Sequence, residues 1–257
     1  MLELALTGLA TTALLMAGAW VLNLLQRNVG IVDVFWGLAI AGAGVTWLVV
    51  PPGASARGTL AVAFAVAWAV RLGLHIAWRN RGKPEDRRYR EIRARNEPNF
   101  GFKSLYLVFA LQAVLAWLVA APLLGATLGT APLGPLDVVA ALLWLGGFLC
   151  ESVADWQLAR FQQQAGAGRG VMDQGVWRYS RHPNYFGECV QWWAIWLIAA
   201  AGGAWWTVFG PLLLTTLLLK VSGVALTEKD IASRRPDYQD YIRRTSAFFP
   251  ARPKQGG

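Results

Sequence analysis

Polar side chains interrupt several long apolar stretches of this sequence at the spacing of a helix face. Asn184, Glu188 and Gln191 form one stripe, and Glu151 with Asp155 forms another. Residues three, four and seven apart share one face of an α-helix, so the members of each stripe would point in one direction. Two such stripes facing each other would line a polar pocket.

The first half of the chain carries a third stripe and an isolated acid. Arg71, His75 and Arg79 share a face, and Asp33 lies just inside another apolar stretch. Ionisable groups inside membrane spans are costly and usually functional. Such groups can also pair between helices or reach back to the membrane surface, so that structural interpretation stays open.

The elements that must position these groups are apolar segments of membrane-spanning length. The 257 residues are 55% hydrophobic, with a mean hydropathy of +0.38. A bilayer core about 30 Å thick needs about 20 apolar residues per helix, and runs this uniform do not fit barrel strands. We predict an all-α, polytopic membrane protein with seven transmembrane helices in one membrane domain, residues 1–257. The predicted spans are approximately 2–25, 29–50, 57–79, 104–128, 134–158, 184–201 and 205–227, followed by a cytosolic amphipathic tail, 228–257.

Basic residues predict the orientation. Lys and Arg are concentrated at Arg27, in 79–103, in 160–181 and after residue 228, whereas Arg57 is the one basic residue in the opposite connections. This positive-inside pattern predicts an outside N-terminus and a cytosolic C-terminus. It places all the polar stripes in the cytosolic half of the membrane, and it explains the net charge of +9 without nucleic acid.

Other features limit the possible chemistry. The two cysteines lie inside spans and there are two histidines, so we expect neither a disulfide framework nor a metal site. The first apolar stretch has no basic residues before it and is expected to be a retained helix. The glycines of 166–170 lack the dinucleotide-binding spacing and predict a flexible loop. Residues 85–95 are expected to form a helix at the membrane surface.

The segment GVWRYSRHPNYFGE, residues 175–188, resembles the signature of the membrane steroid reductases, specifically bacterial proteins similar to steroid 5-alpha-reductases, of the DUF1295 type. DVFWG at 33–37, RLGLH at 71–75, NRGK at 80–83 and the tail from Tyr238 to Pro250 resemble the same group, in the same order. The likeness covers most of the chain from Asp33 onward. A weaker likeness extends to membrane methyltransferases that modify isoprenylcysteine or phospholipids.

The resemblance implies a seven-helix oxidoreductase like the 3-oxo-5-alpha-steroid 4-dehydrogenases. It would reduce the carbon–carbon double bond of an enone in a lipid-like substrate, such as a 3-oxo-4-ene steroid. NADPH would enter from the cytosol, and the apolar steroid or isoprenoid would enter from the bilayer. The protein would be a monomer in the bacterial inner membrane, with its site facing the cytoplasm.

The resemblance also implies catalytic roles. In the animal enzymes a glutamate and a tyrosine donate to the substrate carbonyl. Asp33 takes the place of that glutamate, but span 3 has no matching tyrosine, and His75 is the nearest donor in its place. A buried Asp33 would keep its proton at neutral pH, because burial disfavours the charged form, and would donate as an uncharged acid. Trp36 and Trp192 would shape an apolar slot for the substrate, although ordinary helix packing explains them equally well.

The remaining implied roles concern the cofactor. Asn184 and Glu188 would hold the nicotinamide carboxamide, with Asp155 and Glu151 binding further polar groups. Arginines would grip the phosphates, since their planar fork matches phosphate oxygens. Attraction of the tail to anionic lipid is the alternative for its basic residues. The implied cofactor-binding set also includes Arg178, Tyr179, Arg181, His182, Tyr185, Tyr238, Tyr241, Arg243 and Arg244.

Two other classes of function stay open at this point. An S-adenosylmethionine-dependent membrane methyltransferase would bind the methyl donor, and its transition state builds no oxyanion that would give a buried Asp33 a role. A transporter or non-catalytic lipid-binding protein is the third class. The spans show no paired broken helices or inverted repeat, and polar groups confined to one leaflet provide no path across the membrane.

Overall fold

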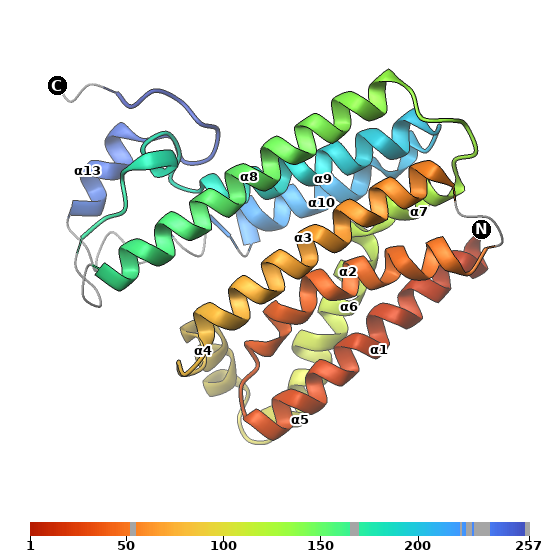
Figure 1. Ribbon diagram of the computed structural model, residues 1–257. Helices are drawn as coiled ribbons and strands as arrows, with labels where there is room; N and C mark the ends of the chain where they lie inside the picture. Colours follow the sequence, from red (N-terminus) through yellow and green to blue (C-terminus); the bar gives the residue numbers. More distant parts are fainter. Residues whose placement is uncertain (52–54, 165–169, 222, 225–227, 229–236, 255–257) are drawn as a thin grey trace. The chain divides into compact units, whose positions relative to one another are not determined.

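The computed structural model describes residues 1–51, 55–164, 170–221, 223–224, 228 and 237–254, and every regular element in these ranges is a helix (Figure 1). The predicted all-α class is therefore confirmed for these residues. The chain divides into two compact units. The first comprises Met1–Asp137 and Ile195–Gly210, and the second comprises Val138–Ala194 and Pro211–Gly257. That the whole chain acts as one membrane domain stays a prediction.

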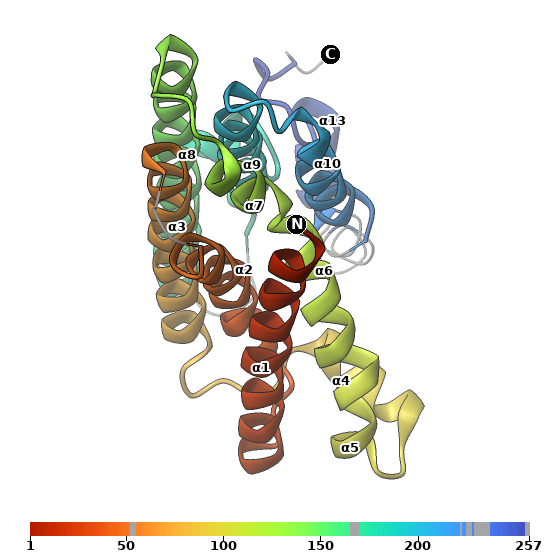
Figure 2. The same cartoon turned by 90° about the vertical axis from the view of Figure 1, so that its right-hand side faces the viewer.

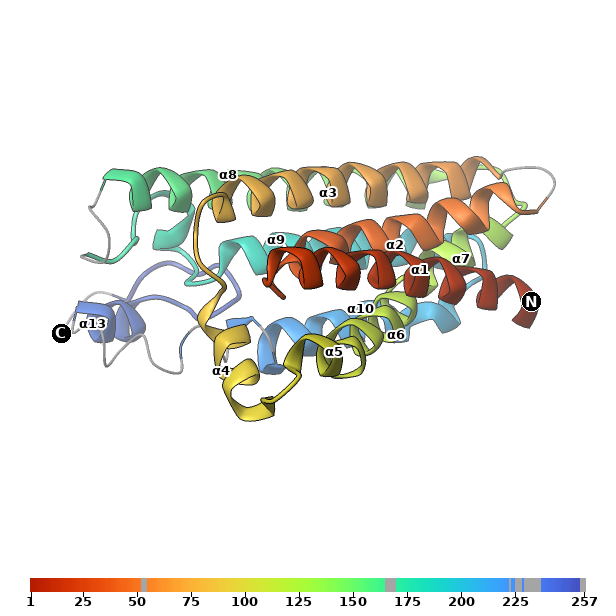
Figure 3. The same cartoon turned by 90° about the horizontal axis from the view of Figure 1, so that it is seen from below.

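The first unit is a bundle of long helices. Its α1 (Leu2–Gln26), α2 (Ile31–Val49) and α3 (Ala56–Asn80) pack side by side, and α6 lies along α1 and α2 (Figure 2). The short α4 and α5 lie next to each other (Figure 3). The remaining elements of this unit are α4 (Arg87–Asn96), α5 (Phe100–Ser104), η1 (Leu105–Ala110), α6 (Leu111–Val119), α7 (Ala121–Leu128) and η3 (Trp205–Val208).

The second unit contains most of two long helices. The first of them begins in the first unit, and the second ends in it. These are α8 (Pro135–Gln164), from Val138 onward, and α9 (Pro183–Ala201), up to Ala194. The other described elements are η2 (Gly175–Arg178), α10 (Phe209–Thr216) from Pro211, η4 (Leu217–Val221) and α13 (Asp237–Arg244). The tail was predicted as an amphipathic helix over 228–248; α13 is its described helix, and 229–236 lie outside the described residues. The predicted glycine loop also falls mainly outside them, at 165–169.

Helix α1 shows how these helices divide their surface. Its buried residues recur every three or four positions, at Gly8, Thr12, Met16, Ala19 and Asn23, which is one face of a helix. Large apolar side chains such as Leu14 and Leu25 point outward, 75% and 76% exposed. An outward apolar face of this kind suits contact with lipid tails.

Five helices are long and apolar enough to cross a membrane: Leu2–Gln26, Ile31–Val49, Ala56–Asn80, Phe100–Leu128 and Pro135–Gln164. They coincide with the first five predicted spans. Predicted span 6 corresponds to α9, which is not one of these five helices. The polar stripe of α9 lowers its mean hydropathy. Predicted span 7 overlaps the shorter apolar helix Trp205–Val221. The count of seven and the orientation therefore stay predictions.

A buried ion pair closes one end of the first unit. Arg57 donates from Nε and Nη2 to both carboxylate oxygens of Asp137, at 3.0 and 2.8 Å, and each side chain is 2% exposed. The same guanidinium donates to the carbonyls of Ala131 and Pro132 at 3.0 Å. Arg57 thus fixes the α7–α8 connection against the beginning of α3.

Two glycines bring α8 and α9 into backbone contact. A Cβ atom on Gly147 would lie 2.7 Å from the carbonyl oxygen of Gly187, and one on Gly187 would lie 2.6 Å from that of Gly147. Small residues permit this close approach between membrane helices. The contact sets the register in which the polar stripes of α8 and α9 face each other.

We predict that Gly147→Ala lowers the stability of the detergent-solubilised protein by about 1–3 kcal/mol, because the new methyl group meets backbone that no rotamer change can move. Gly146→Ala is the matched control, since nothing lies within 4 Å of a Cβ atom at that position; it should be neutral or stabilising by up to about 1 kcal/mol. Thermal unfolding measures both. Equal midpoints for the two variants would contradict the close contact.

Candidate functional site

Asp33 has a tyrosine partner in the first unit. The Tyr89 hydroxyl donates to Asp33 Oδ1 at 2.6 Å, and Arg88 Nη2 donates to Oδ2 at 3.3 Å. Tyr89 is 7% exposed, and the Asp33 side chain is 24% exposed. Asp33 lies in the first turn of α2, whereas both partners come from α4. The acid, the phenol and the guanidinium therefore form one cluster, which we call the donor cluster.

Residues around the donor cluster hold α4 in place. Asp86 caps the helix by accepting from the Arg88 backbone N–H at 2.9 Å. Glu85 accepts from the Val29 N–H at 2.8 Å and from Arg93 at 2.9 and 3.0 Å. Because Val29 belongs to the α1–α2 turn, Glu85 ties the start of α4 to the start of α2. This keeps Tyr89 against Asp33.

Burial and the neighbouring Asp33 charge raise the pKa of Tyr89 well above its usual range of about 10. The phenol therefore keeps its proton at neutral pH and is a hydrogen-bond donor. Burial would lower the pKa of Arg88, but Asp33 and the other neighbouring groups raise it further, so the guanidinium stays charged. Burial likewise would raise the pKa of Asp86, yet its bonds with Arg88 lower it overall.

Sequence reasoning missed Tyr89 because it looked for the tyrosine in span 3. His75, proposed in its place, lies on α3 with its ring 6.1 Å from that of Trp78, and its role stays a prediction. Trp36 lies on α2, one turn after Asp33. One signal was available: Tyr89 is the single aromatic residue in the charged segment 85–96.

In the second unit the polar stripes of α8 and α9 meet. Gln191 Nε2 donates to Glu151 Oε2 at 2.6 Å and to the Gly187 carbonyl at 3.3 Å. One turn along the contact, Asn184 Nδ2 donates to Asp155 Oδ1 at 3.3 Å. These amide nitrogens thus face acceptors, which sets the orientation of both amides.

The oxygens of these two amides are buried, and their hydrogen bonding differs from that of the nitrogens. Within the described residues, Asn184 Oδ1 and Gln191 Oε1 have no hydrogen-bond partner. A buried acceptor without a donor costs about 1–3 kcal/mol, so native proteins keep few of them. Glu188 is also buried, 7% exposed, on the same stripe, and Trp192 beside it is fully buried. The α8–α9 contact therefore contains two buried acceptors that the described residues leave without a donor.

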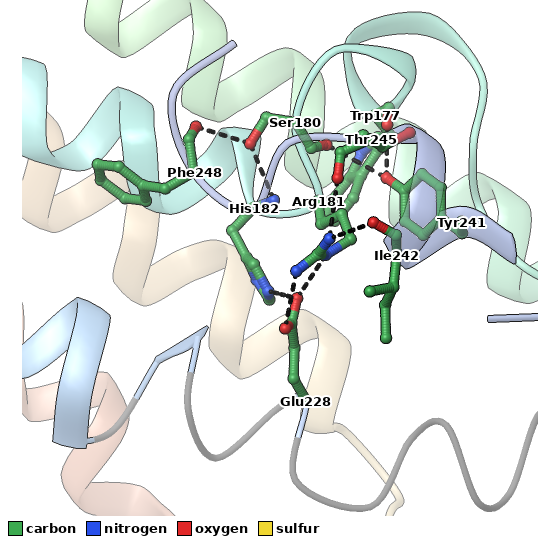
Figure 4. A network of polar contacts seen from close by, with 9 residues as sticks. All are labelled: Trp177, Ser180, Arg181, His182, Glu228, Tyr241, Ile242, Thr245 and Phe248. Carbon is green, nitrogen blue, oxygen red and sulfur yellow. Dashed lines mark hydrogen bonds and ion pairs between the residues drawn. The ribbon is translucent and has the colours of Figure 1, made fainter. Parts of the chain in front are cut away.

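Arg181 and His182 form a network with the chain's own tail (Figure 4). Arg181 donates from Nε and Nη2 to the two oxygens of Glu228 at 2.7 and 3.0 Å, and His182 Nε2 lies 3.0 Å from Glu228 Oε1. Arg181 Nη1 donates to the carbonyls of Ile242 and Thr245 at 3.0 and 2.8 Å. Four of the five N–H donors of this arginine are thus used within the chain.

Further bonds join the motif to the same tail. The Tyr241 hydroxyl donates to the Trp177 carbonyl at 2.5 Å, and Ser180 Oγ donates to the Phe248 carbonyl at 2.8 Å. His182 stacks on Tyr185 with ring centroids 5.5 Å apart. Segment 177–185 therefore forms a platform on which the tail packs.

The other predicted phosphate-binding residues lie nearer the surface. Arg178 and Tyr179 are exposed at the end of η2, while Tyr238 is buried on α13. Arg243 pairs with Asp240, and Arg244 pairs with Asp173 at 2.5 Å; their side chains are 74% and 47% exposed. Arg178, Arg243 and Arg244 thus have more surface available to a ligand than Arg181 has.

Sequence reasoning also missed Glu228, which follows the last apolar run and looked like the first residue of a solvated tail. Its side chain is 20% exposed. Burial alone would raise the pKa of this carboxyl, but the bonds from His182 and Arg181 lower it from the ordinary 4.5 to about 2. No set of three or more His, Cys, Asp or Glu side chains within the described ranges is placed to hold a metal ion.

Residues 19–245 match a family described as a protein of unknown function, DUF1295. The chain belongs to this family. An uncharacterized protein of the fission yeast Schizosaccharomyces pombe is 26% identical over 266 residues, covering 90% of this chain and 75% of the yeast protein. The likeness is therefore not confined to bacterial proteins. No solved structure matches the chain.

We predict that acid weakens the network around Glu228. The folded-state pKa lies below the ordinary value, so its stabilisation is complete above about pH 4.5 and is lost as the pH falls toward 2. A shift of this size corresponds to roughly 3 kcal/mol. Unfolding temperatures in detergent from pH 7 to 3 should fall for the parent. Glu228→Gln should be less stable at pH 7 and should vary less with pH.

Asp240→Asn is the control for this experiment, because Asp240 is 66% exposed and belongs to the same tail. It should change little, as exposed ion pairs contribute about 0–1 kcal/mol. A Glu228→Gln variant that keeps the parent's stability and pH profile would show that the network does not hold the tail.

Proposed function

We propose that this protein is an NADPH-dependent membrane reductase that reduces the carbon–carbon double bond of an enone in an apolar, lipid-like substrate, with a 3-oxo-4-ene steroid as the leading candidate. The observation that carries this proposal is the hydrogen bond between Tyr89 and Asp33. Such a reduction places negative charge on the substrate carbonyl oxygen, which a hydrogen-bond donor must stabilise. The steroid-reductase resemblance implies an acid and a tyrosine for this task, and the donor cluster contains both.

The donor cluster provides a protonated phenol and a carboxyl. In the structure the single Tyr89 proton is donated to Asp33 Oδ1. On binding, the phenol would turn this proton to the enone carbonyl oxygen, and a protonated Asp33 would in turn donate to the phenol oxygen. When bound, NADPH supplies the hydride that is added to the β-carbon. A proton must then reach the enolate: Tyr89 would give its phenolic proton and recover one from the protonated Asp33, which would be reprotonated from solvent. His75 is a further candidate donor, and Trp36 and Trp192 are candidates for contact with the apolar substrate.

Residues of the second unit support the proposed choice of cofactor. The nicotinamide carboxamide carries an NH₂ group with two donors, and the buried oxygens of Asn184 and Gln191 are acceptors without a partner in the described residues. Glu188, Asp155 and Glu151 add carboxylates on the same two helix faces. Exposed arginines are suited to the phosphates: Arg178, Arg243 and Arg244, near Tyr179 and Tyr238 of the same unit.

The network around Arg181 refines that assignment. Because Arg181 and His182 are engaged by Glu228, we propose that with Tyr185 and Tyr241 they shape the cofactor site by holding the tail, and do not grip phosphate directly. A methyltransferase has less support from these residues, because methyl transfer from S-adenosylmethionine builds no oxyanion and would leave the Asp33–Tyr89 pair without a role.

We predict that Tyr89→Phe and Asp33→Asn each lower kcat by about 10²–10³, the usual cost of losing a donor to a developing oxyanion, while NADPH affinity changes less than threefold. NADPH oxidation with a panel of steroid and isoprenoid enones measures this. Tyr106→Phe is the control, because Tyr106 is 61% exposed. Unchanged turnover in Tyr89→Phe would remove the donor cluster from the reaction.

We also predict that Glu188→Ala and Asn184→Ala weaken NADPH binding by about tenfold, since each removes a buried hydrogen-bonding group. Gln162→Ala, at the exposed end of α8, should bind as the parent does. Binding is measured by fluorescence or calorimetry without substrate. A parent that binds S-adenosylmethionine and no NADPH would overturn the reductase proposal.

A further inference from the structure

A cavity in the first unit lies apart from the residues assigned above. Its volume is about 460 Å³, within the range of about 300–1,000 Å³ that small-molecule sites occupy. None of its lining residues belongs to the donor cluster or to the proposed cofactor set. They are Asn23, Leu24, Arg27, Arg93, Glu97, Asn99, Phe100 and Gly101.

The cavity lies where two membrane-length helices end. Arg27 directly follows α1, and the helix Phe100–Leu128 begins in the cavity wall. Trp20 donates to the Gly101 carbonyl at 3.0 Å and packs against Phe102 with centroids 6.2 Å apart. Tryptophan and other aromatic residues gather at this level, where hydrocarbon gives way to headgroups.

The charges in the cavity wall are only partly paired within the protein. Arg93 uses Nε and Nη2 on Glu85 and stacks over Phe100 at 4.8 Å, while its Nη1 makes no hydrogen bond within the described residues. The Arg27 guanidinium and the Glu97 carboxylate likewise form no ion pair there. Glu85 forms the ion pair with Arg93, and Glu97 also attracts Arg93 from a greater distance. Arg27 and Glu97, both exposed, are therefore the cation and the anion of the wall that have no ion pair of their own.

From this charge pattern we infer that the cavity binds a phosphoethanolamine headgroup, the zwitterionic end of a phosphatidylethanolamine lipid. The phosphate would lie against Arg27 and the Nη1 edge of Arg93, because guanidinium groups match phosphate oxygens. The ammonium group would donate to Glu97 and to the Asn99 side chain. A purely anionic headgroup would instead place its charge beside the Glu97 carboxylate.

The surroundings favour a lipid over a soluble ligand. Leu25 and Phe102 directly follow the wall residues Leu24 and Gly101 in the sequence and are 76% and 68% exposed, so they present apolar surface next to wall residues. Acyl chains of a bound lipid would cover these side chains.

The test uses the full chain, purified in detergent, with native mass spectrometry and thermal unfolding as readouts. Phosphatidylethanolamine, phosphatidylglycerol and phosphatidylcholine are added separately, and soluble O-phosphoethanolamine provides a fourth arm. We expect phosphatidylethanolamine to be retained best. Arg27→Gln should weaken its retention by about tenfold, since it removes a charged hydrogen-bond partner.

Glu97→Gln separates a zwitterion site from a simple basic patch. This variant should lose the preference for phosphatidylethanolamine over phosphatidylglycerol. Arg95→Gln, an exposed change on α4 outside the cavity wall, should behave as the parent does. Equal retention of the three lipids, or a preference that Glu97→Gln leaves unchanged, would overturn the inference. Binding of O-phosphoethanolamine as tight as that of the lipid would overturn the lipid as the ligand. None of these readouts depends on reductase activity.

Discussion

An ionisable side chain beside an apolar helix needs a partner from the protein itself, because hydrocarbon provides none. Three pairs meet this constraint between residues distant in the sequence, with separations of 80, 56 and 47 positions: Arg57 with Asp137, Asp33 with Tyr89, and Arg181 with Glu228. Each pair draws in a segment that lies outside the five helices long and apolar enough to cross a membrane. The α7–α8 connection, α4 and the tail therefore owe their places to a polar partner at a helix end, and the polar chemistry of the chain gathers where those segments meet the helices.

The helices themselves were accessible from the sequence because a bilayer imposes length and apolarity locally. Predicted spans and observed helices coincide closely, for example 57–79 against Ala56–Asn80. The register of α8 against α9 was also within reach, since the spacing of Glu151, Asp155, Asn184 and Gln191 placed them on single faces. Span 6 shows where hydropathy fails as a criterion for a membrane span. The polar stripe that the proposed function assigns to the cofactor also lowers the hydropathy of α9.

The partners of Asp33 and Arg181 could not be predicted from the sequence, for a different physical reason. Tyr89 meets Asp33 only because Glu85 returns the chain to Val29, and Glu228 meets Arg181 only because the tail folds back onto segment 177–185. Neither contact produces a periodic pattern in the sequence, since each depends on where a short polar segment packs in the folded chain. Arg181 belongs to a motif that resembles a cofactor-binding signature, but the carboxylate of Glu228 has already engaged its guanidinium.

Segment 177–191 shows how one motif can serve both structure and binding. Arg181 and Ser180 donate to Glu228 and to the tail backbone, and four of the five Arg181 N–H donors are used within the described residues. A few residues later, Asn184 and Gln191 orient their nitrogens on carboxylates and keep buried oxygens without a donor. Satisfied groups of the first kind explain why the tail packs where it does. The described residues supply no donor to the acceptors of the second kind, and a bound donor would remove their cost, which is why the proposed function assigns the α9 end of the motif to the nicotinamide.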